Sequence, residues 1–265
     1  MVPRSFLRQR LLTSDPSRAF CTQVYGQFDS QMRVPYHPSV RKETMQRLIK
    51  HFPDALFALE ANQRVNFALL KEGSRPRNTL FACSVCPDEI NHYPNSLNNR
   101  LTRVAGRAFY MGGLEGIAFI GKVGYNAFTA HMPKDGNLVI QFCPHVGVSR
   151  DGEFGRYSRQ GQDKADLACG AAVSALRWLE ENEWAPQDDK DASVKVPEGT
   201  DTFDYQFAYI VEALKPHYAE IVAHEEPMVA LAYAMYEVTR RYIESIVIPI
   251  AGAKVTMLGG IQINV

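Results

Sequence analysis

Two compact apolar runs, each closed by a proline, constrain the fold of this chain more than any other feature. The first extends from Thr79 to Val85 and the second from Asn137 to Cys143. Continuous apolar character over so few residues is typical of strands that are buried on both faces of a sheet. Pro87 and Pro144 follow the two runs, and proline cannot continue a central strand because it has no amide hydrogen to donate. The sequence therefore predicts two buried strands with sharply defined ends.

Helical patterns alternate with these strands along the chain. Apolar residues at helical spacing predict helices from about residue 38 and at 53–70, 97–107, 163–181, 203–223 and 225–244. Residues 246–250 and 255–265 are β-rich and predict two closing strands. Alternation of this kind predicts a single α/β domain with a central, mostly parallel sheet that is flanked by helices.

Composition excludes two classes of partner. Hydrophobic residues make up 46% of the 265 residues, which is enough to fill a core. The 29 basic and 29 acidic residues give a formal net charge of zero, which argues against nucleic acid because phosphate binding usually needs a basic surplus. No apolar run approaches the roughly 18 residues of a membrane span, so no span is predicted.

The first 30 residues differ in kind from the rest, and the folded domain is expected at 31–265. They are acid-poor and contain hydroxyl residues and the arginines Arg4, Arg8, Arg10 and Arg18. This composition resembles an organellar transit peptide, although an ordinary N-terminal arm is an equal alternative. The five cysteines are odd in number and no secretory signal is visible, which favours a reducing compartment. We expect a mitochondrial location, with plastid and cytoplasm as alternatives.

Three potential metal ligands lie on or beside predicted rigid elements. Cys86 and His145 follow the two buried runs, and Cys169 lies in the first turns of the helix predicted at 163–181. Ligands collect outside the carboxyl ends of strands in open α/β sheets, which is where Cys86 and His145 are placed. Two thiolates and one imidazole are an accepted ligand set for catalytic zinc with an open fourth position. Asp88 is a natural fourth ligand or a replacement for one.

Simpler interpretations of the same residues stay open at this point. A single cysteine such as Cys169 is most often a small buried apolar residue, and His145 alone is as readily a structural histidine. Cys83 and Cys86 could form half of a structural zinc site or a redox pair. No second closely spaced Cys/His pair completes a structural site, and the pair does not open a predicted helix as redox pairs usually do.

Two further features are candidates for the site. His131 follows a small apolar segment and is a candidate acceptor for a proton that leaves a pocket. Residues 109–122 are rich in glycine, which permits close backbone approach. This stretch either lines a small-ligand pocket with its amides or forms a surface turn. Its spacing does not match a phosphate-binding loop.

Four motifs together resemble the limiting-CO2-inducible B/C family of algal CO2-concentrating systems, also called theta-type carbonic anhydrases. They are Cys-Pro-Asp-Glu-Ile-Asn at 86–91, the glycine-rich segment at 112–124, Pro-His-Val-Gly-Val-Ser-Arg-Asp-Gly at 144–152 and Ala-Cys-Gly-Ala at 168–171. They occur in the same order as in that family, and the matching stretch covers roughly Thr79 to Leu176. The resemblance is therefore more specific than any one motif.

The resemblance implies a β-carbonic-anhydrase-like fold, usually built as a dimer, and reversible hydration of CO2 to bicarbonate by a zinc-bound hydroxide. Cys86, His145 and Cys169 match the zinc ligands. Asp88 matches an aspartate that either ligates zinc or swings away to admit water. A homodimer or a heteromer with a paralogue is expected, with CO2 and bicarbonate as the small-molecule substrates.

One departure from the pattern of β-carbonic anhydrases affects Asp88. An arginine two residues after the aspartate holds it off the metal in those enzymes, but Ile90 occupies this position here. Arg100 and Arg103 on the following helix are candidate replacements, and Arg100 is preferred. Without such a partner, Asp88 could lock the metal. A zinc-binding family member that is catalytically silent and acts in a CO2- or bicarbonate-handling complex is therefore the alternative function.

Overall fold

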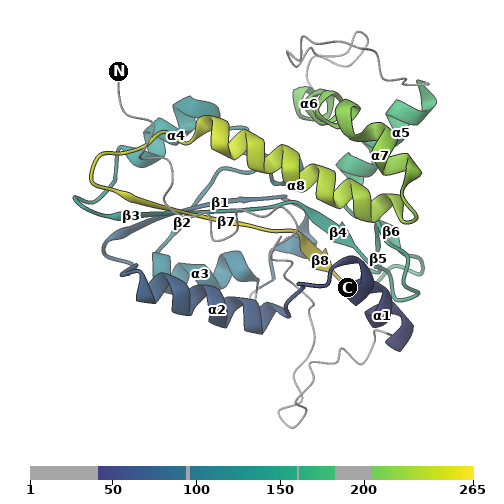
Figure 1. The fold of residues 1–265 in the computed structure, drawn as a ribbon, viewed down its shortest axis with the longest axis horizontal. Coiled ribbons are helices and arrows are strands. Elements are labelled where there is room, and N and C mark those ends of the chain that lie inside the picture. The colour runs from purple at the N-terminus through teal and green to yellow at the C-terminus, as the bar shows by residue number, and fades with distance from the viewer. Residues whose placement is uncertain (1–40, 94–95, 160, 183–203) are drawn as a thin grey trace.

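A computed structural model describes residues 41–93, 96–159, 161–182 and 204–265 of the chain. The predicted targeting segment at 1–30 and the beginning of the helix expected from about residue 38 lie outside this described part. Figure 1 shows a central sheet with α2 and α3 on one face and α4 and α8 on the other, which confirms the predicted α/β architecture.

The central sheet has four parallel strands in the order β2-β1-β3-β7. They are β2 (Ala108–Tyr110), β1 (Thr79–Val85), β3 (Asn137–Cys143) and β7 (Lys254–Gly259). The two central strands have the predicted bounds and pair in register, with Thr79 opposite Asn137 and Val85 opposite Cys143. The residues that follow Val85 and Cys143 therefore lie at the same edge of the sheet.

Two small sheets lie beyond this edge. One is parallel and pairs β4 (His145–Gly147) with β8 (Gln262–Asn264). The other is antiparallel and pairs β5 (Arg156–Tyr157) with β6 (Asp166–Leu167). The C-terminal strand predicted at 255–265 is thus confirmed as β7 and β8, which run along the central sheet and then past its edge (Figure 1).

Alternating residues of the central strands pack against the helices on opposite faces, as expected for strands buried on both sides. Ala82, Ile140 and Phe142 face the cluster formed with α4 (Gly121–Thr129) and α8 (Pro227–Ile246). Phe81 and Val139 face α2 (Ala58–Lys71) and α3 (Leu97–Ala105). The remaining helices are α1 (Lys42–His51), α5 (Gly170–Glu181), α6 (Tyr205–Leu214) and α7 (Tyr218–Ala223). No helix of the described ranges is long and apolar enough to cross a bilayer.

Four predicted elements have different bounds or a different type. The helix expected at 163–181 begins only at Gly170, because Asp166 and Leu167 pair with β5 instead. The helix expected at 203–223 divides into α6 and α7 at a 3-10 turn that contains Pro216, which cannot supply an amide hydrogen. The helix expected at 53–70 begins at Ala58. The strand expected at 246–250 is absent, because Ile246 is the last residue of α8 and residues 247–250 form no strand.

Candidate metal centre

The three predicted ligands meet at the carboxyl edge of the central sheet. Cys86 directly follows β1, His145 begins β4 just after β3, and Cys169 precedes the first turn of α5. All three are buried, and their ligand atoms lie within 4.8 Å of one another. The sheet register places the first two side by side, and the chain that connects β6 to α5 adds the third.

The spacing and chemistry of these donors fit a zinc ion. The two Sγ atoms of Cys86 and Cys169 are 3.8 Å apart. Two zinc–sulfur bonds of about 2.3 Å at a tetrahedral angle place their sulfurs roughly 3.8 Å apart. The neighbouring Cys86 thiol and burial raise the pKa of Cys169 to about 12. The Cys169 thiol therefore needs a cation such as zinc beside it to ionise.

His145 is oriented so that one ring nitrogen faces the thiols. Its Nδ1 donates to Oδ1 of Asn264 at 3.2 Å, and Nδ2 of Asn264 donates to the carbonyl oxygen of Ile90 at 2.9 Å, which fixes the direction of the amide. Nε2 of His145 is buried and has no hydrogen-bond partner among the described residues. A buried nitrogen lone pair of this kind is what a metal ligand offers.

Asn264 was not predicted, because it lies 119 residues after His145 and no local pattern marks it. A partner that fixes the tautomer of a ligating imidazole commonly changes metal affinity 10- to 100-fold when it is lost. We expect Asn264→Ala to weaken zinc binding about tenfold or more, measured by competition with a chromophoric chelator. Asn264→Asp keeps an acceptor for Nδ1 and is the matched control. Equal affinity in Asn264→Ala and the wild type would show that Asn264 does not orient the imidazole.

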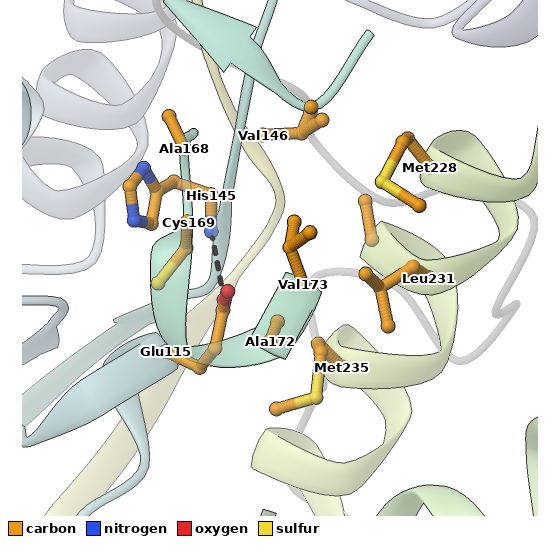
Figure 2. Close-up of a pocket in the computed structure, with 12 residues that line it drawn as sticks. Glu115, His145, Val146, Ala168, Cys169, Ala172, Val173, Met228, Leu231 and Met235 are labelled. Atoms are coloured by element: carbon orange, nitrogen blue, oxygen red, sulfur yellow. Dashed lines mark hydrogen bonds between the residues drawn. The ribbon is translucent and has the colours of Figure 1, made fainter. Parts of the chain in front are cut away.

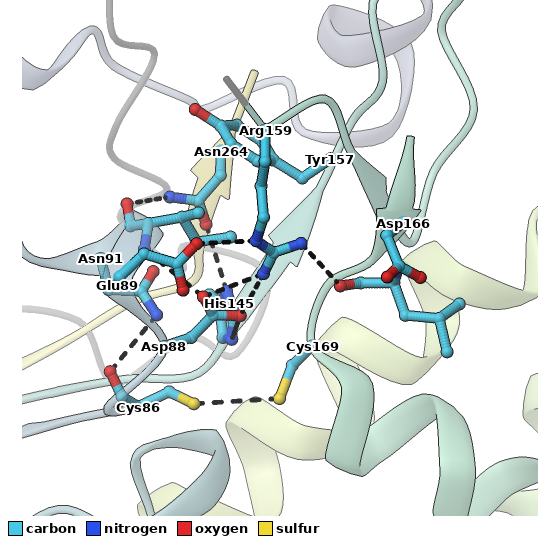
Figure 3. Close-up of polar contacts among 12 residues, drawn as sticks. Cys86, Asp88, Glu89, Asn91, His145, Tyr157, Arg159, Asp166, Cys169 and Asn264 are labelled. Carbon is cyan, nitrogen blue, oxygen red and sulfur yellow. Dashed lines mark hydrogen bonds and ion pairs between the residues drawn. The ribbon is translucent and has the colours of Figure 1, made fainter. Parts of the chain in front are cut away.

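Asp88 lies next to the ligands but is held by an arginine. Its Oδ2 is 3.9 Å from Nε2 of His145, and Asp88 is not a member of the close group of three. Nη2 of Arg159 donates to Oδ1 at 3.1 Å and to Oδ2 at 3.2 Å. Burial and the nearby Glu89 carboxyl raise the pKa of Asp88, and the positive charge of Arg159 opposes this rise. Figure 3 shows Arg159 above the ligands, directed at both carboxylates.

Arg159 connects two of the segments that carry ligands. Its Nε donates to Oε1 of Glu89 at 2.6 Å, and its Nη1 donates to the carbonyl oxygen of Leu167 at 3.3 Å. Arg159, which lies just after β5, thus makes the contact with Asp88 that an arginine was expected to make, and a role for Arg100 in the site stays a prediction. Arg100 belongs to α3, which packs against α2 and β1. Arg159 is 71 residues from Asp88, so sequence proximity gave no signal.

His131 lies away from the site, and its predicted role as a proton acceptor is corrected. It is an exposed residue in the turn between α4 and β3, at the amino end of β3. The ligands gather at the carboxyl end of this strand. Seven residues of β3 separate the two edges, a span of about 20 Å.

The glycine-rich segment packs closely against the ends of β1 and β3. A Cβ atom on Gly112 would lie 2.7 Å from the carbonyl oxygen of Val85, and one on Gly116 would lie 2.6 Å from that of Cys143. The predicted close backbone approach is therefore present. The amides of Gly113 and Gly116 bond within the loop, so the segment contributes a side chain, Glu115, rather than backbone donors.

The arrangement does not support a redox pair of Cys83 and Cys86. Cys83 is fully buried in the cluster on the α3 face, and burial strongly raises the pKa of its thiol. The Sγ atom of Cys86 instead lies 3.8 Å from that of Cys169. Cys143 belongs to the same apolar cluster as Cys83. Thiols with raised pKa values are poor nucleophiles.

A family comparison agrees with this geometry. Residues 55–265 match the family model of limiting CO2-inducible proteins B/C, beta carbonic anhydrases. The chain belongs to this family. No match was found among curated proteins.

Solved structures of LCIB-type proteins share the fold. A histidine-to-alanine mutant of PtLCIB4, a homolog of the limiting CO2-inducible protein LCIB, has a TM-score of 0.72 and 30% identity, over 83% of this chain and 87% of that chain. PtLCIB4 itself has a TM-score of 0.69 at 30% identity, over 83% and 88%. LCIB has a TM-score of 0.59 at 23% identity, over 84% and 88%, which is a similarity of fold.

Proposed function

We propose that this LCIB/C-family protein binds zinc through Cys86, His145 and Cys169 and catalyses the reversible hydration of CO2 to bicarbonate. The observation that carries the proposal is the contact between Asp88 and Arg159 at the edge of the ligand group. An aspartate held in this way is available to act on the nucleophile instead of serving as a fourth ligand.

Zinc held by this site would supply Lewis acidity that lowers the pKa of a water molecule and so provides a hydroxide nucleophile near neutral pH. Other side chains of the site orient the nucleophile and the ligands. The Asp88 carboxylate accepts a hydrogen bond from the nucleophile and directs its lone pair, while the charge of Arg159 favours the ionised carboxylate and the guanidinium turns it to one side. Asn264 fixes the imidazole of His145. His131 has no part in this proposal because of its position.

Asp88 also favours one specific alternative. Its Oδ2 is only 3.9 Å from Nε2 of His145, so a small rotation would make it a ligand. The protein would then retain zinc without turnover, as a silent member of a CO2- or bicarbonate-handling complex. Assembly as a homodimer or with a paralogue, and a mitochondrial location, are proposals that rest on the family resemblance and on residues 1–30.

Zinc content and isotope exchange test the proposal together. We expect one zinc per chain by mass spectrometry of the purified protein, and exchange of oxygen-18 out of labelled CO2 well above the rate in buffer. Exchange should fall to the buffer rate after dialysis against a strong chelator and return with added zinc. A protein purified without zinc contradicts the proposal. Stoichiometric zinc without exchange supports the silent alternative.

A further inference from the structure

Glu115 is a buried acidic side chain that the proposed reaction does not use. It is 1% exposed and lies in a pocket whose other lining residues are mostly apolar, among them Ala172, Leu231 and Met235. Figure 2 shows its carboxyl directed at His145 and Cys169, away from α8. Burial of a carboxyl is unfavourable unless polar partners compensate it. A residue needed only for packing would be apolar here, so the carboxyl indicates a role other than packing.

The backbone that carries Glu115 has an uncommon conformation. Glu115 has a φ of 56° within the short 3-10 turn Leu114–Gly116, a region that residues other than glycine rarely occupy. The turn is fastened on both sides, because Thr239 donates to the carbonyl oxygen of Glu115 at 3.4 Å and Ser84 donates to that of Gly116 at 2.7 Å. Strained residues that the surroundings hold in place concentrate at functional sites.

The Glu115 carboxyl bonds to one of the three proposed ligands and shares a pocket with another. Its Oε2 accepts a hydrogen bond from the backbone amide of His145 at 3.3 Å. Cys169 lines the same pocket beside it (Figure 2). The side chain thus holds the start of β4 next to the residue before α5.

We propose that Glu115 is a positioning residue of the metal centre, whose carboxyl holds the His145 backbone amide and so keeps this ligand in place beside Cys169. The inference rests on the proposed metal site and deepens it. Hydrogen bonds to ligands orient them and tune the metal, and their loss commonly costs 10- to 100-fold in metal affinity. Glu115 supports the site from the interior, whereas Arg159 supports it from the side of Asp88.

Three variants test this role through zinc affinity and the cobalt(II) spectrum. Glu115→Leu removes the bond to the His145 amide and should weaken zinc binding about 10- to 100-fold, with altered cobalt(II) bands. Glu115→Asp withdraws the carboxyl by one methylene group and should weaken binding in the same direction. Glu115→Gln keeps the shape and an acceptor for the His145 amide, so it should bind zinc within about threefold of the wild type.

Gln141→Leu is the matched control, since Gln141 is another buried polar residue of the same edge, and its amide contacts Cys143 and none of the proposed ligands. It should leave zinc affinity and the cobalt bands unchanged. Thermal unfolding of the metal-free proteins checks that each variant folds. If Glu115→Leu does not fold, Glu115→Asp decides the question. Wild-type affinity and spectrum in the folded variants overturn this inference alone, whereas a wild type that binds no zinc overturns the proposed function as well.

Discussion

Replacement of Cys169 by serine is expected to abolish both zinc binding and CO2 hydration. A thiolate is a far better zinc ligand than a neutral hydroxyl group, and Cys169 is one of only two thiols in the buried group. The variant also removes the sulfur that lies 3.8 Å from Cys86. Zinc measured by mass spectrometry should fall from one per chain to a trace, and oxygen-18 exchange should fall to the rate in buffer.

Loss of zinc should also lower the thermal stability of the variant relative to the zinc-loaded wild type. A ligand that binds only the folded state at 100 times its dissociation constant adds about 2.7 kcal/mol to the free energy of unfolding. The variant cannot gain this increment, so its melting temperature should not respond to added zinc. The wild type should respond strongly. Calorimetry with and without one equivalent of zinc measures the difference directly.

Cys143→Ser is the matched control for Cys169→Ser. Cys143 ends β3 two residues before His145, but its thiol lies in the apolar cluster on the α3 face and accepts a hydrogen bond from Gln141 at 3.7 Å. The serine variant should keep one zinc per chain, whatever small effect it has on packing. Equal zinc loss in both variants would mean that Cys169 is not a ligand. The loss of zinc would then result from impaired folding after removal of a buried thiol.

The sequence was most informative where one local signal decided the structure. The runs 79–85 and 137–143 were predicted with the bounds they have, because continuous apolar character and a following proline are both local. Register then made Cys86 and His145 neighbours without further information. Cys169 joins the other two candidates from an incorrectly predicted element, since the pairing of Asp166 with Tyr157 replaces the first turns of the expected helix.

The surroundings of the ligands were not predictable, because each depends on a distant segment. Asn264 reaches His145 from the C-terminal strand, Arg159 reaches Asp88 from the loop after β5, and Glu115 reaches the His145 backbone from a strained turn. Local periodicity carries no information about such contacts. Arg100 was preferred as the partner of Asp88 only because it lies nearby in the sequence.

Ile90 lies where the family resemblance leads to the expectation of an arginine, and Arg159 makes the contact with Asp88 instead. Ile90 is buried, and its backbone amide donates to Asp88 at 3.4 Å, so it retains one backbone contact to the carboxylate. Arg159 adds a positive charge beside the Asp88 carboxylate. Its guanidinium binds Asp88, Glu89 and Leu167 at once, which a lysine cannot do because it lacks the planar fork of donors.

Arg159→Met is therefore expected to lower CO2 hydration about 100-fold or more while zinc is retained. The methionine keeps an apolar stem but no charge, so nothing opposes rotation of Asp88 towards the metal. With Asp88 as a fourth ligand, the cobalt(II)-substituted variant should lose the spectral response to azide that the cobalt wild type shows. Arg159→Lys should recover only part of the activity. Stopped-flow hydration assays and cobalt spectra provide the two readouts.

A double-mutant cycle separates positioning from mere structural support. Asp88→Ala should also lower hydration about 100-fold, but it removes the carboxylate that would block the metal. If Arg159 acts only through Asp88, adding Arg159→Met to Asp88→Ala should cause no further loss, and the azide response should return. Arg156→Met is the control, because Arg156 lies in the same segment but contacts Glu153 and Ala165. Losses of CO2 hydration that add in the double variant would contradict action of Arg159 through Asp88. An intact azide response in Arg159→Met would show that a group other than Arg159 keeps Asp88 off the metal.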